Sequence, residues 1–238
     1  MKIVIIGYGK MGKAVEKMAL AQGHIIAGIV HSAEAQNSAH ILHQADVAIE
    51  FTGADSAFEN IKRCIDAGVP VVCGSTGWLN TLQDAELYCK ENDGTFLYAS
   101  NFSIGVNIFF EINNKLAALM NKQPGYDVSI KEIHHNQKKD IPSGTAITLA
   151  EQVIGKLERK TSWSLKDDGP NILTITGERT DSAPGTHYVK YTSPIDDIEI
   201  IHTAHNRDGF AQGALLASTF IYAKKGIFTM NDVLGLRV

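Results

Sequence analysis

The chain has 238 residues, of which 44% are hydrophobic and 20% charged, so it can bury a sizeable core as one large domain or as two smaller ones. Its net charge of -4 provides no broad cationic field for nucleic acid or an anionic membrane, so an anionic ligand must meet a local cluster of cations. No apolar run is long enough for a signal-peptide core or a membrane span, and the three cysteines lack C-x-x-C spacing. These features predict a cytoplasmic protein with neither a disulfide framework nor a bound metal.

Strands and helices alternate over the first hundred residues. Short apolar, β-branched runs predict strands, and apolar residues at three- and four-residue spacing predict the helices between them. The strands are expected at 3–6, 24–31, 45–52, 70–75 and 95–100, with helices after the first strand, at 55–67 and at 80–92. This alternation is typical of an α/β fold with a doubly wound parallel sheet.

The pattern changes after residue 103. One helix is predicted at 105–120, a strand then leads from residue 127 into two histidines, and a helix follows from about Thr145. Three strand candidates come next without long helices between them, at 171–179, 186–193 and 198–205. They predict a mixed sheet with antiparallel pairs.

A last helix is expected at 209–226, with Gly226 placed to end it. We therefore expect a dinucleotide-binding domain over residues 1–103, to which the C-terminal region 210–238 returns. A smaller α+β domain over 104–209 completes the chain.

The first strand ends in "GYGKMG", which has G-x-G-x-x-G spacing between a strand and a helix. In this position Gly7 permits a tight turn, Gly9 lets the backbone approach a pyrophosphate, and Gly12 allows the helix to pack close to the strand. A glycine-rich turn that binds nothing is the alternative. The predicted cofactor contacts in this loop are Gly7, Tyr8, Gly9, Lys10, Met11 and Gly12, and His31 at the end of the second strand is a further predicted cofactor contact.

An acidic residue that binds the adenosine ribose is expected at the end of the second strand, but His31 and Ser32 stand there. With no carboxylate to repel a 2′-phosphate, and with Lys10 and Lys13 beside the loop, we expect NADPH to be used at least as well as NADH. The alternative is that Glu34, further along the loop, serves as the ribose acid.

Two more glycine-containing turns follow predicted strands, "GSTG" at 74–77 and "ASNFSIG" at 99–105. Ligands of open α/β sheets bind at this edge, so the turns and the glycine loop outline one cleft. Taken singly, either turn could be an ordinary loop.

The stretch "HHNQKKDIPSGTA", residues 134–146, concentrates titratable chemistry in front of a helix. Pro142 precedes a helix start at which Ser143, Gly144 and Thr145 offer a hydroxyl and free N–H groups, which suits a carboxylate or phosphate. A histidine and a lysine add proton donors near it. A solvated basic strand end before a capped helix is the alternative.

These residues resemble the 4-hydroxy-tetrahydrodipicolinate reductases, also called dihydrodipicolinate reductases, of lysine and diaminopimelate biosynthesis. The family motif E-x-H-H-x-x-K-x-D-x-P-S-G-T-A is matched from Glu132 to Ala146. The resemblance covers the whole chain through the glycine loop and "EFTG" (50–53), "GSTGW" (74–78), "ASNFSIGVN" (99–107) and "FAQGA" (210–214).

The resemblance implies a catalytic acid/base at His134, a proton donor at Lys138 and a substrate contact at His135. It also implies that Ser143, Gly144 and Thr145 bind a substrate carboxylate. The nicotinamide end of the cofactor would contact Gly74, Ser75, Thr76, Ala99, Ser100, Asn101 and Phe102. A strict strand would point the two histidines to opposite faces, so if both serve the site the strand must end or twist there.

The same resemblance implies a homotetramer, with the second domain serving substrate binding and oligomerisation. The chain departs from many family members by a shorter glycine loop and by a short segment, 32–44, after the second strand. Two other classes stay open: another two-domain nicotinamide dehydrogenase, for an amino acid or a sugar, and a redox sensor that binds a dinucleotide and a protein partner.

Overall fold

The computed structural model describes residues 1–31, 39–181, 183–206 and 208–236. The chain divides into two compact units. The first unit consists of Met1–Ile104 together with Asp208–Val238, and the second unit is the continuous segment Gly105–Arg207.

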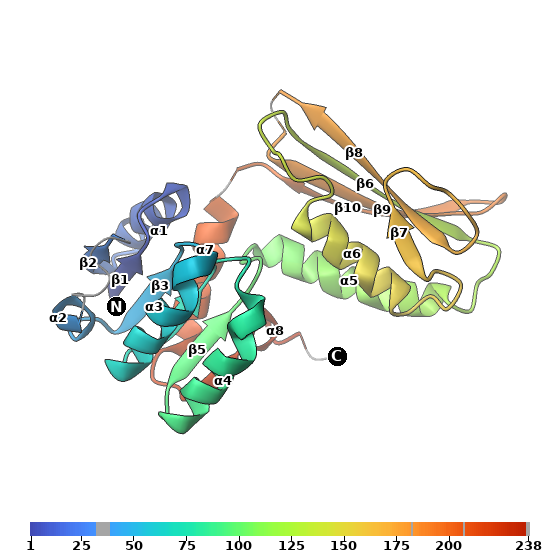
Figure 1. Ribbon diagram of the computed structural model, residues 1–238. Helices are drawn as coiled ribbons and strands as arrows, with labels where there is room; N and C mark the ends of the chain where they lie inside the picture. The colour runs from blue at the N-terminus through green and yellow to red at the C-terminus, as the bar shows by residue number, and fades with distance from the viewer. Residues whose placement is uncertain (32–38, 182, 207, 237–238) are drawn as a thin grey trace. The chain divides into compact units, whose positions relative to one another are not determined.

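The first unit is built on a six-stranded parallel sheet in the order β11-β5-β4-β3-β1-β2 (Figure 1). Its strands are β1 (Lys2–Ile6), β2 (Ile25–Val30), β3 (Val47–Glu50), β4 (Val71–Cys73), β5 (Thr95–Tyr98) and β11 (Gly226–Phe228). Its helices are α1 (Lys10–Ala21), α2 (Ala39–Leu42), α3 (Ala54–Asp66), α4 (Leu82–Glu91), α7 (Asp208–Ile221) and α8 (Met230–Leu234). The predicted α/β fold with a doubly wound parallel sheet is confirmed.

Helices cover both faces of this sheet. Side chains of α3 and α4 pack on one face, whereas those of α1 and α7 pack on the other. The central strands are therefore buried on both sides, which is why β1 and β3 read as continuous apolar runs rather than alternating ones.

The end of the chain differs from the prediction. Helix α7 ends at Ile221, and Ala223 adopts a left-handed backbone with φ 59°, so the helix cannot continue to residue 226. Gly226, with φ 115°, begins strand β11, and its N–H donates to the Gly94 carbonyl at 3.0 Å. The prediction that Gly226 ends the helix was wrong, because an edge strand three residues long gives no periodic signal.

The second unit carries a five-stranded mixed sheet in the order β10-β9-β6-β8-β7. The strands are β6 (Asp127–His135), β7 (Ser162–Ser164), β8 (Ile172–Thr180), β9 (Gly185–Thr192) and β10 (Asp197–Ala204). Strand β6 runs parallel to β8 and antiparallel to β9, so the predicted sheet with antiparallel pairs is present.

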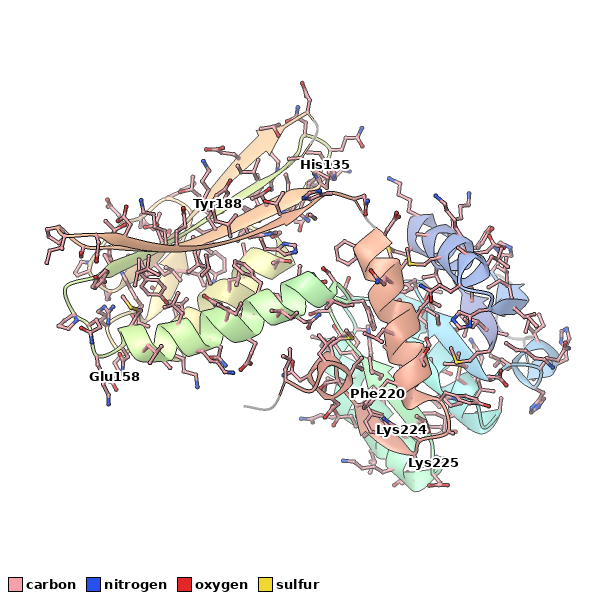
Figure 2. All side chains as sticks on the ribbon, turned by 180° about the vertical axis from the view of Figure 1, so that it is seen from behind. His135, Glu158, Tyr188, Phe220, Lys224 and Lys225 are labelled. Carbon is pink, nitrogen blue, oxygen red and sulfur yellow. The ribbon has the colours of Figure 1, made fainter. Side chains whose placement is uncertain are left out.

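Helices α5 (Ile104–Met120) and α6 (Gly144–Ile154) lie side by side on one face of this sheet (Figure 1). Residues of β6 alternate between buried and open positions, so Val128 and Ile130 face these helices. Among the described residues no helix covers the opposite face, on which Tyr188 of β9 lies opposite Ile201 of β10 (Figure 2). No described helix is long and apolar enough to cross a membrane.

Candidate active site

The glycine loop joins β1 to α1 in the first unit. Gly7 has φ +91°, and a Cβ there would lie 2.2 Å from the Phe51 carbonyl oxygen. A Cβ at Gly12 would lie 2.2 Å from the Gly7 carbonyl oxygen. Packing thus requires glycine at positions 7 and 12. A Cβ at Gly9 would meet nothing within 4 Å, so this glycine faces open space at the N-terminus of α1.

Tyr8 contacts three polar side chains at the surface of the loop. Its hydroxyl donates to Glu16, and its ring meets the His31 ring edge-on with centroids 5.9 Å apart. The Lys13 ammonium lies 5.7 Å from the Tyr8 ring centroid. The structure therefore brings His31 and Lys13 together at Tyr8, while Lys10 is exposed nearby. Ser32 and Glu34 lie outside the described residues.

A buried carboxylate holds the carboxyl edge of the sheet together. Glu50, at the end of β3, is 0% exposed and accepts hydrogen bonds from the backbone N–H of Thr52 at 3.0 Å and from the Thr52 hydroxyl. Asn60 Nδ2 donates to the same carboxylate at 3.4 Å and Cys73 Sγ at 3.0 Å. We call Glu50 with Thr52, Asn60 and Cys73 the Glu50 cluster; all its donors are electrically neutral.

Hydrogen bonds and ring packing at the same sheet edge position the turns after β4 and β5. The Ser75 hydroxyl accepts a hydrogen bond from the Thr52 N–H at 2.8 Å, and the Ser75 carbonyl accepts one from Trp78 at 2.8 Å. A Cβ at Gly74 would lie 2.0 Å from the Phe51 ring, which itself packs edge-on against Phe102.

The predicted cofactor contacts in these turns thus gather at the ends of adjacent parallel strands. They are Gly74, Ser75 and Thr76 after β4 and Ala99, Ser100, Asn101 and Phe102 after β5.

A second buried carboxylate lies in the other unit. Glu132, on β6, is also 0% exposed. Its Oε2 accepts a hydrogen bond from the backbone N–H of Ser143 at 3.0 Å, and its Oε1 accepts one from the Arg179 guanidinium at 3.1 Å. The Nε2 atom of His134 lies 3.5 Å from Oε2. Unlike Glu50, whose donors are neutral, this carboxylate contacts a guanidinium and a histidine.

His187, on β9, completes this arrangement. Its Nε2 lies 3.3 Å from His134 Nε2 and 3.1 Å from the Ser143 hydroxyl oxygen, and the two histidine rings pack edge to face with centroids 5.0 Å apart. A Cβ at Gly185 would lie 2.9 Å from the His134 ring, so glycine makes room for it. We call Glu132, His134, Ser143, Arg179 and His187 the Glu132 cluster.

Arg179 connects the cluster to the loop that carries the two lysines. Its guanidinium donates to the carbonyl oxygens of Asp140 at 2.7 Å and Lys138 at 3.4 Å. The Lys138 ammonium contacts both carboxylate oxygens of Asp140, at 2.9 and 2.8 Å, whereas Lys139 is exposed. The buried carboxylate thereby fixes the backbone beside Lys138.

Helix α6 begins next to the cluster. Ser143 is its N-cap, and the Ser143 hydroxyl accepts a hydrogen bond from the Ala146 N–H at 3.2 Å. The first N–H groups of a helix have no intrahelical partner, so those of Gly144 and Thr145 can bind an anion. The Ile141–Pro142 peptide bond in front of the helix is cis.

The two adjacent histidines of β6 behave differently. The strand extends through His135, which is labelled in Figure 2. Alternation along the strand therefore places the His134 and His135 side chains on opposite faces of the sheet. His134 is 7% exposed and belongs to the Glu132 cluster, while His135 is half-buried at the end of the strand. The substrate contact assigned to His135 stays a prediction.

The cluster shifts the pKa values of its members. Burial acts to raise the pKa of Glu132, but hydrogen bonds from His134, Ser143 and Arg179 outweigh it and hold this pKa at about 2. Burial lowers the pKa of His187 to about 4, and the neighbouring His134 acts in the same direction. At neutral pH the cluster therefore contains an ionised carboxylate beside a neutral His187.

Glu132, His134 and His187 also bring donor atoms within 4.8 Å of one another, close enough for a metal ion. Protein groups already satisfy the carboxylate, since Ser143 and Arg179 each donate to one of its oxygens. The geometry of these three residues is therefore accounted for by hydrogen bonding within the protein.

Sequence reasoning missed Arg179, His187 and the part played by Glu132. His187 stands two residues before Val189 and four before Tyr191, which are both buried, so it occupies an inward position of an alternating strand. A polar residue at such a position needs a partner, and that was the available signal. The partners lie on β6 and at the start of α6, far away in sequence.

The chain matches two family profiles, described as "Dihydrodipicolinate reductase, N-terminus" over residues 1–102 and "Dihydrodipicolinate reductase, C-terminus" over residues 105–234. It is 46% identical over 237 residues to the 4-hydroxy-tetrahydrodipicolinate reductase of Christiangramia forsetii, which covers 99% of this chain and 98% of that protein. The protein of the same description from Neisseria meningitidis serogroup B is 34% identical over 204 residues, or 82% of this chain and 75% of that one.

Solved structures share the fold. Dipicolinate-bound dihydrodipicolinate reductase from Paenisporosarcina sp. TG-14 superposes with a TM-score of 0.79 at 20% identity, covering 96% of this chain and 97% of that one. A probable dehydrogenase from Thermotoga maritima reaches a TM-score of 0.56 at 10% identity, over 99% of this chain and 93% of that one.

The Rossmann-type unit with its glycine loop, and the separate unit with its ionisable cluster, define an oxidoreductase of two units. The two profiles together match residues of both units. The chain belongs to the dihydrodipicolinate reductase family, whose reaction is a reduction step in lysine and diaminopimelate biosynthesis.

Proposed function

We propose that this chain catalyses the NAD(P)H-dependent reduction of 4-hydroxy-tetrahydrodipicolinate, reacting as the conjugated cyclic imine, to tetrahydrodipicolinate. The observation that carries the proposal is the Glu132 cluster at the start of α6. The cluster brings two histidines to a helix N-terminus, and Arg179 connects it to the loop that carries Lys138. The substrate needs both anion recognition and a proton, which these groups can provide.

The substrate carboxylate is bound at the N-terminus of α6. The N–H groups of Gly144 and Thr145 and the hydroxyl of Ser143 supply donors, and the helix dipole favours negative charge there. Lys138 adds a cation to the same region, and His135 is the further substrate contact that the family implies.

Proton delivery belongs to His134 and Lys138. A bound reduced nicotinamide supplies the hydride, and the electron-rich enamine that results on the substrate must be protonated. His134 is the acid/base and Lys138 the proton donor; the Nε2 atom of His134 lies 3.5 Å from the Glu132 carboxylate, which holds the ring in place.

The cofactor contacts are those of the first unit. The open space at Gly9 lets a pyrophosphate approach the N-terminus of α1, and the turns after β4 and β5 contact the nicotinamide end. With Lys13 and His31 at Tyr8, a 2′-phosphate meets a cation there, and the Glu16 carboxylate beside the same ring already accepts a hydrogen bond from the Tyr8 hydroxyl. NADPH is thus used at least as well as NADH.

We also propose a cytoplasmic homotetramer. The face of the second unit's sheet that no described helix covers supports self-association, because Ile201 is 52% exposed there opposite Tyr188. Light scattering of the purified protein measures the assembly state, and a monomer at micromolar concentration would contradict the proposal.

The activity test uses purified protein with NADPH and the condensation product of pyruvate and aspartate semialdehyde. Loss of reduced-nicotinamide absorbance that requires both the protein and the condensation product is the expected result. Absorbance loss with amino-acid or sugar substrates instead would indicate another dehydrogenase. Dinucleotide binding without turnover of any of these substrates would favour the sensor.

A further inference from the structure

We propose that Arg179 is a positioning residue that holds Asp140 and, through the Asp140 carboxylate, orients the ammonium of Lys138 for proton delivery. The inference rests on the proposed function, because it assumes that Lys138 gives a proton to the reduced substrate. It adds a residue of β8, outside the motif at residues 132–146, to the machinery that handles this proton.

The first step is the anchor of Arg179 inside the second unit. Arg179 pairs with His134 in the parallel register of β6 and β8, and its side chain is only 15% exposed. Its Nη2 atom lies 3.1 Å from Oε1 of the buried Glu132. The pKa of Glu132, about 2, keeps this carboxylate ionised at neutral pH, and a guanidinium is always charged. A buried ion pair therefore fixes the position of the guanidinium.

The second step is the contact of this guanidinium with the loop between β6 and α6. Its Nη2 donates to the Asp140 carbonyl at 2.7 Å, and its Nε donates to the Lys138 carbonyl at 3.4 Å. Both acceptors are backbone atoms, so the contacts fix the path of the chain beside Lys138. The planar fork of an arginine can reach Glu132 and both carbonyls together, which the single ammonium of a lysine cannot do.

The packing beside the loop is consistent with this anchoring. A Cβ at Gly177, two residues before Arg179, would lie 3.1 Å from Cγ2 of Ile141 and 3.5 Å from Oε1 of Glu132. Glycine at this position thus lets the loop approach the buried carboxylate closely. At the other end of the loop, the Asn136 side chain donates to the Asp181 carboxylate, just beyond β8. Both ends of the loop are therefore attached to β8 or to the residue that follows it.

The third step leads from Asp140 to the proton donor. The Lys138 ammonium contacts the two carboxylate oxygens of Asp140 at 2.9 and 2.8 Å. Burial acts to raise the pKa of Asp140, but hydrogen bonds from Lys138 and from its own backbone outweigh burial and lower this pKa. The Asp140 side chain is 59% exposed, so solvent screens the pair and it adds little to stability. Its consequence is the orientation of the ammonium.

The kinetic test uses Arg179→Lys with NADPH and the condensation product of pyruvate and aspartate semialdehyde. This variant keeps a positive charge beside Glu132 but loses the fork that reaches the two carbonyls. We expect kcat to fall about 10-fold, because the proton donor is misplaced, and the KM of NADPH to change by less than about twofold. A parental kcat would overturn the inference.

A double-mutant cycle separates positioning from general damage. In a Lys138→Ala background, Arg179→Lys is expected to add less than about a twofold loss of kcat, because Arg179 acts through Lys138. A merely structural role would lower kcat equally in both backgrounds. The same 10-fold loss without Lys138 would therefore contradict the inference.

Lys131→Ala is the matched control. Lys131 on β6 forms an ion pair at 2.7 Å with Glu178, the residue before Arg179, so this variant breaks an ion pair across the same two strands. Both of these side chains are exposed, and we expect a parental kcat. A 10-fold loss in the control would show that any lost ion pair between β6 and β8 slows the reaction, which would overturn the inference.

Asp140→Asn tests the last step and leaves the buried ion pair intact. The variant keeps the backbone carbonyl that Arg179 contacts but removes the carboxylate that orients Lys138. Because the side chain is exposed, the chain is expected to fold normally. We expect kcat to fall a few-fold, less than in Arg179→Lys, since the pair is screened by solvent. A parental or higher kcat would overturn the step through this carboxylate.

Hydrogen exchange of the unliganded full chain provides a readout that does not depend on turnover. In Arg179→Lys the amides of residues 136–141 are expected to exchange about 10-fold faster, while those of α5 and β9 keep parental rates. Asp140→Asn is expected to keep the parental exchange of this loop, because its backbone contacts remain. Unchanged loop exchange in Arg179→Lys, or faster exchange throughout the second unit, would overturn the inference.

The outcomes also separate this inference from the proposed function. If the parental chain does not reduce the imine, the proposed function fails, and the role of Arg179 in proton delivery fails with it. If the parental chain reduces the imine and Arg179→Lys matches its kcat, only the role of Arg179 fails.

Discussion

Two carboxylates that are equally buried have opposite surroundings in the two units. Glu50 and Glu132 are both 0% exposed. Glu50 receives backbone, hydroxyl, amide and thiol donors, all neutral. Glu132 receives a guanidinium and stands beside two histidines. The same residue type therefore joins neutral turns in the first unit and sustains an ionic network in the second.

The difference follows from what each unit is expected to do. Holding turns at a sheet edge requires only satisfied hydrogen bonds, and neutral donors provide them without further charge. Handling a proton requires groups whose charge can change, and a fixed negative charge among them sets their protonation. If this contrast is correct, perturbing each cluster should change different properties.

The largest effect is expected at Lys138. Replacing Lys138 with alanine removes the proposed proton donor, so kcat/KM should fall by about 10²- to 10⁴-fold. Lys139→Ala is the control, because the Lys139 side chain is exposed to solvent. This variant should keep a kcat/KM close to the parental value. Steady-state kinetics on both folded variants measure this. Equal losses would mean that the pair acts as a general positive charge.

A stability comparison of the two carboxylates sharpens the contrast. Glu132→Gln leaves the Arg179 charge without its partner and should lower the free energy of unfolding of the second unit by about 3–5 kcal/mol. Glu50→Gln removes no charge partner and should cost about 1–3 kcal/mol in the first unit.

Each unit contains one of the two tryptophans, Trp78 or Trp163, so fluorescence can follow them separately in urea. Trp78→Phe leaves Trp163 as the reporter of the second unit, and Trp163→Phe leaves Trp78 for the first. A larger loss for Glu50→Gln than for Glu132→Gln would contradict the contrast.

The pH dependence of stability should also differ. The pKa of His187 falls from 6.5 in the unfolded chain to about 4 in the folded one, so the unfolded state binds more protons between these values. The second unit should therefore lose about 3 kcal/mol as the pH falls from 6.5 to 4. Urea unfolding followed through Trp163 measures the loss, and His187→Gln should remove it.

Glu132 adds a second window with the same sign. Its folded pKa is about 2 against an ordinary 4.5, so the stability it contributes is complete above pH 4.5 and is lost as the pH falls toward 2. A second unit whose stability rises as the pH falls from 6.5 to 4.5 would contradict the His187 assignment, and one whose stability rises as the pH falls from 4.5 to 2 would contradict the Glu132 assignment.

The smallest effect is expected at the cofactor. Lys13 is exposed, so Lys13→Ala should weaken NADPH only a few-fold, with NADH affected less. His31→Asp places a carboxylate beside Tyr8 and should shift preference toward NADH. The kcat/KM values for the two cofactors measure both changes. A strong parental preference for NADH that Glu34→Ala abolishes would contradict this assignment.

The sequence predicted what local patterns encode. The β-branched runs and the glycine spacing predicted the parallel sheet, and the P-S-G-T stretch predicted the start of α6, because each signal lies within a few residues. The Glu132 cluster depends on register: Gly177 and His187 flank Glu132 across β8 and β9. Strand pairing over such separations has no local signature, so Arg179 and His187 were not predicted.

The last strand has a consequence for the order in which the chain can fold during synthesis. Strand β11 pairs with β5, and the Thr95 hydroxyl donates to the Lys224 carbonyl at 2.6 Å, although 129 residues separate the two along the chain. A ribosome releases the whole second unit before it releases α7 and β11. Until then the nascent first unit has an open edge at β5 and a sheet face without α7. The incomplete first unit is therefore exposed to chaperones and proteases after the whole second unit has been synthesised.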